Sequence, residues 1–132
     1  MSSPSDVNNH GSALSRIKEG KHDDKDLSCL IDYFYSAGDL TPLRELLTSD
    51  NSGLVSNGVY ILSEIGRSGA PLIDAAIGLA RHERDDVRYW AIDSLMANLP
   101  RERMISLINE WDLANDEFKG VRRSVARYLE RT

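Results

Sequence analysis

The sequence predicts an all-α protein, and two observations lead to this fold class. From Ser12 onward, apolar residues recur at three- and four-residue spacing, as they do on one face of a helix. No run of five or more residues alternates between apolar and polar, and β-branched residues are nowhere concentrated. The 132 residues suffice for one domain with one modest core. Residues 1–11, rich in Ser, Asn and Gly, predict a disordered tail before a single helical domain over 12–132.

The domain is expected to hold about eight helices, each bounded by capping residues, prolines or glycines. In the first half they are a short helix around Leu14 and Ile17 ended by residues 19–21, one over 23–38 with Asp23 or Asp24 as cap and Gly38 at its end, one over 39–50 with Thr41 as cap and Pro42 at its first position, and one over 52–66 ended by Gly66. In the second half they are 70–83 opened by Pro71, 85–99 after two acids, 100–114 opened by Pro100, and 116–132 with Asp116 as cap.

Three of these helices share one apolar pattern at spacing i, i+4, i+8. Its members are Leu54, Gly58 and Leu62 in the first helix, Val87, Ala91 and Leu95 in the second, and Val121, Val125 and Leu129 in the third. The pattern thus starts at position 54, returns at 87 and returns again at 121, and a Val-Arg pair recurs at 87–88 and 121–122. A helix pair that recurs at this period is typical of a helical solenoid.

Residues 62–95 resemble a short HEAT repeat of the bacterial kind. The matching features are a Leu-Gly helix end, a turn, a helix with spaced leucines, an acidic turn, and Val87-Arg88 followed by Ala91 and Leu95. The resemblance is weaker over 41–66 and 100–129 and does not extend to positions 1–38. It implies a right-handed α-α superhelix of about three HEAT-like helix pairs with an N-terminal helical cap. The opening of 41–47 is similar to an ankyrin repeat, but no second copy follows.

The resemblance also implies structural roles for single residues. Gly58 and Ala91 are expected to be small because the two helices of a pair cross closely there. The family's arginine usually reaches an acid in a turn and ties neighbouring repeats together. Asp116 and Arg122 have a suitable spacing, whereas His82 stands where Arg88 needs an acid, so the ladder is in doubt at that repeat. Gly120, inside the last predicted helix, has no such explanation.

Composition and charge favour an acidic protein of the cytoplasm. Positions 1–80 carry eleven acids and six bases and positions 81–132 carry ten of each, so the net charge of −5 arises in the first part. An acidic surface repels nucleic acid and attracts basic partners. The single Cys29 suits a reducing compartment, and the sequence shows neither a secretion signal nor a membrane span. We expect a monomer or a weak oligomer.

The sequence gives no indication of catalysis, a metal or a cofactor. Three histidines and Cys29 are scattered rather than clustered. The acid pairs at 23–24 and 85–86 begin helices, where carboxylates act as caps. Ser68 lacks a nucleophile motif. The stripe of Arg123, Arg127 and Arg131 is best explained as a solvated helix face.

The expected function is therefore protein binding by the concave face, which the second helix of each pair would line. The residues predicted to contact a partner there are Ser56, Tyr60, Tyr89, Asp93 and Arg122. Exposed tyrosines are frequent anchors of protein partners, whereas Trp90 and Trp111 are expected in the core. The most specific hypothesis is an immunity-type inhibitor of a basic cognate toxin. The alternatives are an adaptor or assembly factor for another enzyme, and a nucleic-acid-acting or lyase-type HEAT-like enzyme.

Overall fold

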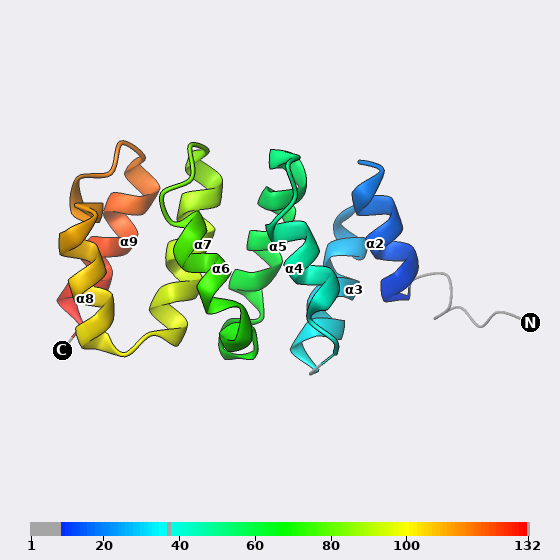
Figure 1. The fold of residues 1–132 in the computed structure, drawn as a ribbon, viewed down its shortest axis with the longest axis horizontal. Helices are drawn as coiled ribbons and strands as arrows, with labels where there is room; N and C mark the ends of the chain where they lie inside the picture. Colours follow the sequence, from blue (N-terminus) through cyan, green and yellow to red (C-terminus); the bar gives the residue numbers. More distant parts are fainter. Residues whose placement is uncertain (1–8, 37, 132) are drawn as a thin grey trace, which may run out of the picture.

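The computed structural model describes residues 9–36 and 38–131, and this part of the chain is entirely helical. It contains eight α-helices and two short 3₁₀ segments and no strand, which confirms the predicted all-α class. Figure 1 shows the helices side by side along the longest axis in chain order, with α2 at one end and α8 and α9 at the other. No helix in the described ranges combines the length and the apolarity needed to cross a bilayer.

The observed elements follow the predicted ones closely. In chain order they are α2 (His10–Lys18), α3 (Asp24–Tyr35), α4 (Thr41–Leu47), α5 (Ser52–Glu64), η1 (Gly66–Leu72), α6 (Ile73–Leu79), α7 (Asp85–Asn98), α8 (Arg101–Glu110), η2 (Leu113–Asn115) and α9 (Lys119–Glu130). Asp23 caps α3 as expected and forms a reciprocal capping box with Asp26. Gly66 ends the turn after α5 with a φ of 55°, a conformation that glycine adopts without strain.

Three helix starts differ from the prediction. α2 begins at His10 with Asn9 as its cap, inside the expected tail, while residues 1–8 of that tail lie outside the described residues. α4 starts at Thr41 rather than being capped by it, because the Asp39 carboxylate accepts from both the amide and the hydroxyl of Thr41. Asp116 does not cap α9, since its carboxylate accepts from the amide of Phe118 in the preceding turn, at 2.8 Å.

The helices pack as consecutive pairs and also across pairs. α2 contacts α3, α4 contacts α5 and α6 contacts α7, while α5 contacts α7 and α7 contacts α9. One hydrophobic core runs through all of them. Gly58 is needed where α4 and α5 cross, because an added Cβ would lie 2.9 Å from Cβ of Leu46.

The positions of the predicted repeat pattern are buried with one exception. The buried members are Gly58, Leu62, Val87, Arg88, Ala91, Leu95, Val121 and Val125. Leu129 was expected to be buried like Leu95 but is 41% exposed, because no element of the described chain covers that side of α9. Trp90 and Trp111, expected in the core, are both half-buried against it.

Candidate functional site

Four aromatic side chains form a continuous row across α5, α7 and the turn before α9. Tyr60 of α5 meets Trp90 of α7 edge to face, with ring centroids 5.0 Å apart. Trp90 meets Tyr89 at 4.7 Å, and Tyr89 meets Phe118 at 6.2 Å, both close to perpendicular. All four are half-buried, so each ring packs on the core and still offers surface to solvent. The row therefore joins three helix pairs into one apolar surface.

A hollow of about 340 Å³ opens beside this row. Its lining residues are Asp86, Tyr89, Trp90, Phe118 and Gly120. Gly120, unexplained by the sequence, has a reason here: an added Cβ would lie 2.6 Å from Cε2 of Phe118. The glycine lets the Phe118 ring fold back over the start of α9, where it forms one wall of the hollow.

Serine–carboxylate hydrogen bonds join α5 to α7 along the same surface. Ser56 donates to Asp86 at 2.6 Å, and Ser63 donates to Asp93 two turns further along. Asp86 also accepts a two-pronged interaction from Arg84, with both distances 3.0 Å. Burial raises the pKa of Asp86, but the hydrogen bonds from Ser56 and Arg84 outweigh burial and hold its pKa below the usual value. These contacts fix the relative position of the helices that carry the aromatic row.

The structure brings four of the five predicted partner-binding residues onto neighbouring parts of α5 and α7. Tyr60 and Tyr89 belong to the aromatic row, while Ser56 and Asp93 take part in the serine–carboxylate contacts. Arg122 lies apart, because its guanidinium donates to the backbone carbonyls of Asp116 and Glu117, at 2.7 and 2.8 Å.

Three residues of this surface escaped the sequence reasoning. Trp90 was expected in the core, Asp86 was interpreted only as a helix cap, and Phe118 was not among the candidates. The signal for Phe118 was its spacing from Gly120, since a glycine two residues after an aromatic leaves room for the ring. The contact of Phe118 with Tyr89 joins residues of different helix pairs, and no local pattern in the sequence reports it.

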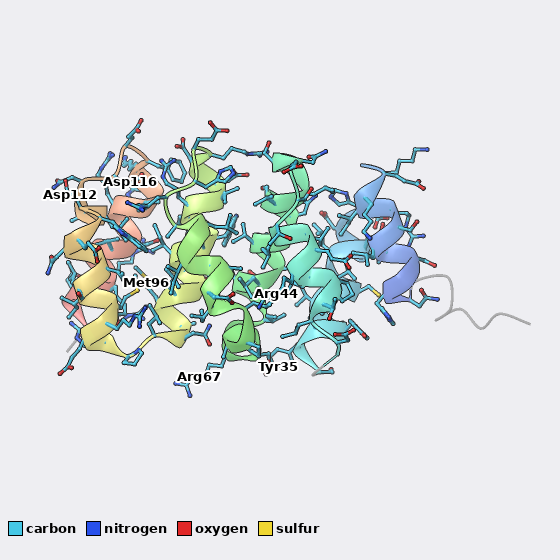
Figure 2. The ribbon with its side chains drawn as sticks, in the orientation of Figure 1. Tyr35, Arg44, Arg67, Met96, Asp112 and Asp116 are labelled. Atoms are coloured by element: carbon cyan, nitrogen blue, oxygen red, sulfur yellow. The ribbon has the colours of Figure 1, made fainter. Side chains whose placement is uncertain are left out.

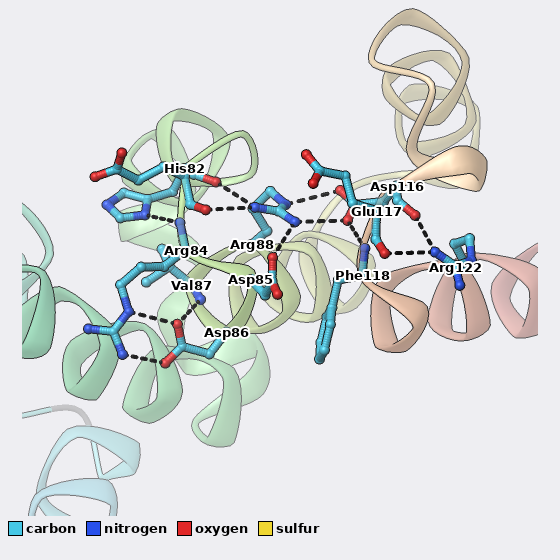
Figure 3. A network of polar contacts seen from close by, with 11 residues as sticks. His82, Arg84, Asp85, Asp86, Val87, Arg88, Asp116, Glu117, Phe118 and Arg122 are labelled. Atoms are coloured by element: carbon cyan, nitrogen blue, oxygen red, sulfur yellow. Dashed lines mark hydrogen bonds and ion pairs between the residues drawn. The ribbon is translucent and has the colours of Figure 1, made fainter.

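Arg88 forms the second polar centre, at the turns before α7 and α9 (Figure 3). Its Nε and Nη2 bind both carboxylate oxygens of Asp116 at 3.0 Å, and Nη2 also donates to Asp85. Its Nη1 donates to the carbonyls of His82 and Glu83, at 3.0 and 3.1 Å. All five N–H groups of a guanidinium are thereby used, so Arg88 has no donor left for a ligand.

The Arg88–Asp116 pair answers the doubt about the ladder between helix pairs. Arg88 takes its acid from the turn of the following helix pair, so no acid is required at His82. Both side chains are about nine-tenths buried, with 9% and 10% of their surfaces exposed. Burial raises the pKa of Asp116, but the hydrogen bonds from Arg88 prevail and the pKa of this carboxyl falls below its usual value. The pair is thus an ionised clamp between α7 and the turn before α9.

Among the described residues, no three His, Cys, Asp or Glu side chains gather in an arrangement that could hold a metal ion. Cys29 is half-buried on α3, and burial raises the pKa of its thiol. No protein family matches the chain, and comparisons with curated proteins and with solved structures give no significant match.

Proposed function

We propose that this protein is a non-catalytic binding module that holds a basic protein against the aromatic row of α5, α7 and Phe118. The observation that carries the proposal is the continuity of the row: four half-exposed rings from three helix pairs touch one another beside a hollow. Aromatic side chains that are packed at their base and exposed at their edge lose little conformational entropy on binding, and they dominate the energetics of many protein interfaces.

The scaffold of this surface is proposed to be a HEAT-like stack of helix pairs. Support comes from polar contacts that join equivalent helices at a nearly constant separation of 28 to 30 residues. These contacts are Arg44–Asp74 between α4 and α6, Ser56–Asp86 and Ser63–Asp93 between α5 and α7, and Arg88–Asp116 between α7 and the turn before α9. Repetition of one contact type along the chain is expected when similar units are stacked with the same geometry.

Charge indicates the chemistry of the partner. The two helices that carry most of the row hold four carboxylates, Glu64, Asp85, Asp86 and Asp93. The single basic residue on these helices is Arg88, which is buried and saturated. Glu64, Asp85 and Asp93 are exposed, so they offer acceptors to lysines and arginines around an apolar anchor in the hollow. The proposed partner is therefore a basic protein that inserts an apolar side chain between Trp90 and Phe118.

The test compares two tyrosine variants in pull-downs from native lysate with identification by mass spectrometry. Tyr89→Ala removes the centre of the row, whereas Tyr35→Ala is the matched control, because Tyr35 is 64% exposed on α3 and lies at the opposite edge of the molecule from Asp116 (Figure 2). We expect a basic protein to bind the unaltered chain and the Tyr35→Ala variant and to be lost with Tyr89→Ala. The captured protein is then purified and titrated against all three chains by calorimetry.

Equal affinity of the two variants for the purified partner would refute the proposal. The narrower hypothesis of an immunity-type inhibitor remains a prediction with its own readout. If the partner is a basic toxin, adding the unaltered chain should suppress the activity of that toxin, and Tyr89→Ala should restore it.

A further inference from the structure

Arg122 repeats half of the contacts that Arg88 makes. Arg88 Nη1 binds the carbonyls of the residues six and five positions before it, and Arg122 Nη1 does the same with Asp116 and Glu117 (Figure 3). α7 and α9 therefore share one register, in which position 88 of α7 corresponds to position 122 of α9. This register allows the two helices to be compared position by position.

The remaining donors of the two arginines differ. Arg88 uses Nε and Nη2 to hold Asp116, which belongs to the turn of the next helix pair. In the described part of the chain, Nε and Nη2 of Arg122 contact no acceptor. Arg122 is thus placed and anchored like a clamp whose carboxylate is missing.

The apolar positions show the same difference. Val87 and Ala91 of α7 are buried, and so are their counterparts Val121 and Val125 of α9. By contrast, Arg88, Ile92 and Leu95 are buried on α7, whereas the counterparts on α9 are exposed. These counterparts, here called the end face, are Arg122, Ala126 and Leu129. The positions that change are those that only a following helix pair covers, so the α8–α9 unit on α7 is an internal template for what fits the end face.

Charge selects among the occupants. The exposed charged residues of α9 and its end are Lys119, Arg122, Arg123, Arg127, Arg131 and Glu130, a clear basic excess. Two end faces placed against each other would bring these arginines together, which disfavours a symmetric dimer through this surface. An acidic occupant is attracted instead.

We propose that the end face binds a helix pair of an acidic partner protein, as α7 binds the α8–α9 unit. A carboxylate in the turn that connects the partner's helices pairs with Nε and Nη2 of Arg122, and an apolar side chain of the partner covers Leu129. This surface is separate from the aromatic row and accepts a partner of opposite charge.

The experiment supplies the missing unit in a known form. The full chain is extended after Thr132 by a second copy of residues 99–132, so that the copied aspartate stands 28 residues after Arg122, the separation of Arg88 and Asp116. We expect the extended chain to melt cooperatively at a temperature roughly 5 °C above the native-length chain. Replacing only the copied aspartate by Asn should remove most of this gain.

Arg122→Gln provides the second arm, in both chain lengths. The substitution should cost little in the native-length chain and should remove the gain of the extended chain. Rapid proteolysis of the appended unit with an unchanged melting temperature, or an equal effect of Arg122→Gln in both lengths, would overturn the proposal. Sedimentation of the native-length chain tests the rival occupant, since self-association that Arg122→Gln abolishes would assign the end face to a second copy instead.

Discussion

At the scale of single residues, the molecule depends most on an arginine that has no free donor. Arg88 joins two carboxylates and two carbonyls, and its burial means that water cannot replace the partners it holds. Removing one member of a buried ion pair leaves the other member desolvated and unpaired. Arg88 is therefore the position where a conservative reading of charge is least safe, since lysine lacks the planar fork that binds Asp116.

Replacing Arg88 by Met should lower the free energy of unfolding by about 3 kcal/mol, because Asp116 stays buried without a counter-ion. Arg122→Met is the matched control, since it removes the equivalent arginine of α9 from an exposed position and should cost less than about 1 kcal/mol. Urea denaturation followed by circular dichroism measures both. Similar losses for the two variants would show that the carbonyl contacts, rather than the ion pair, carry the stability.

Ser94 presents the opposite case, a buried hydroxyl that stabilises nothing. Its side chain is fully buried on α7, and its Oγ has no hydrogen-bond partner among the described residues. Ser94→Ala should raise the free energy of unfolding by about 1 kcal/mol, because it removes an unsatisfied polar atom and favours the helix. Ser56→Ala, which deletes the donor to Asp86, should instead lower it. The same denaturation experiment distinguishes the two signs, and a loss with Ser94→Ala would reveal a partner for that hydroxyl.

At the scale of elements, two helix glycines serve different purposes and should respond differently to the same substitution. Gly58→Ala forces a Cβ against Leu46 Cβ at 2.9 Å, between two packed helices, and should cost about 2 kcal/mol. Gly120→Ala meets only the far edge of the Phe118 ring, which can rotate away, and alanine favours the helix. We expect Gly120→Ala to keep the melting temperature while weakening the basic partner, because the hollow changes shape. Thermal denaturation and calorimetry check the two halves of this prediction.

The first two helices are joined by an ion pair that should make the molecule sensitive to acid. The Arg16 guanidinium, with contacts between 2.6 and 3.0 Å, lowers the pKa of Asp26, and burial opposes it less strongly. A carboxyl whose pKa is lower in the folded state than its value of about 3.9 in the unfolded chain stabilises the fold above that pH. This stability is lost as the pH falls through the folded pKa.

The expected result is a melting temperature that changes little above about pH 4 through these carboxyls and falls steeply below it. Asp26→Asn should melt lower than the unaltered chain at pH 7, and the two curves should converge in acid, where Asp26 is protonated. Melting curves between pH 2.5 and 7, a range set around the carboxyl pKa values, provide the measurement. A constant difference at every pH would mean that the charge of Asp26 contributes nothing.

At the scale of the whole molecule, the sequence predicts what is periodic and misses what depends on the stacking of distant elements. Helical spacing, caps and prolines place all eight helices of the described chain, because these signals are local. The partner of Arg88 could not be predicted, since Asp116 comes within reach only when the α8–α9 turn folds onto α7. The same holds for the aromatic row, which joins residues of three helix pairs. Tyr60 and Tyr89 were accessible to prediction because their positions follow from the repeat register.

The two proposed surfaces divide the molecule by charge, and this division leads to the last prediction. The aromatic row lies among the carboxylates of α5 and α7, whereas the end face lies among the arginines of α9. Because the surfaces share no residue, binding at each should be independent, as for separate sites. Tyr89→Ala should abolish the basic partner and leave the stabilisation by the appended unit intact.

Arg122→Gln should have the reverse effect, and the double variant should combine both losses without further change. Calorimetry with the basic partner and melting curves of the extended chain measure the two functions on the same four proteins. If either substitution alters both readouts, the surfaces are one site, and a single partner that spans α7 and α9 replaces the two proposed here. Independence would instead support the role of an adaptor, which joins a basic and an acidic protein through opposite charges on one helical scaffold.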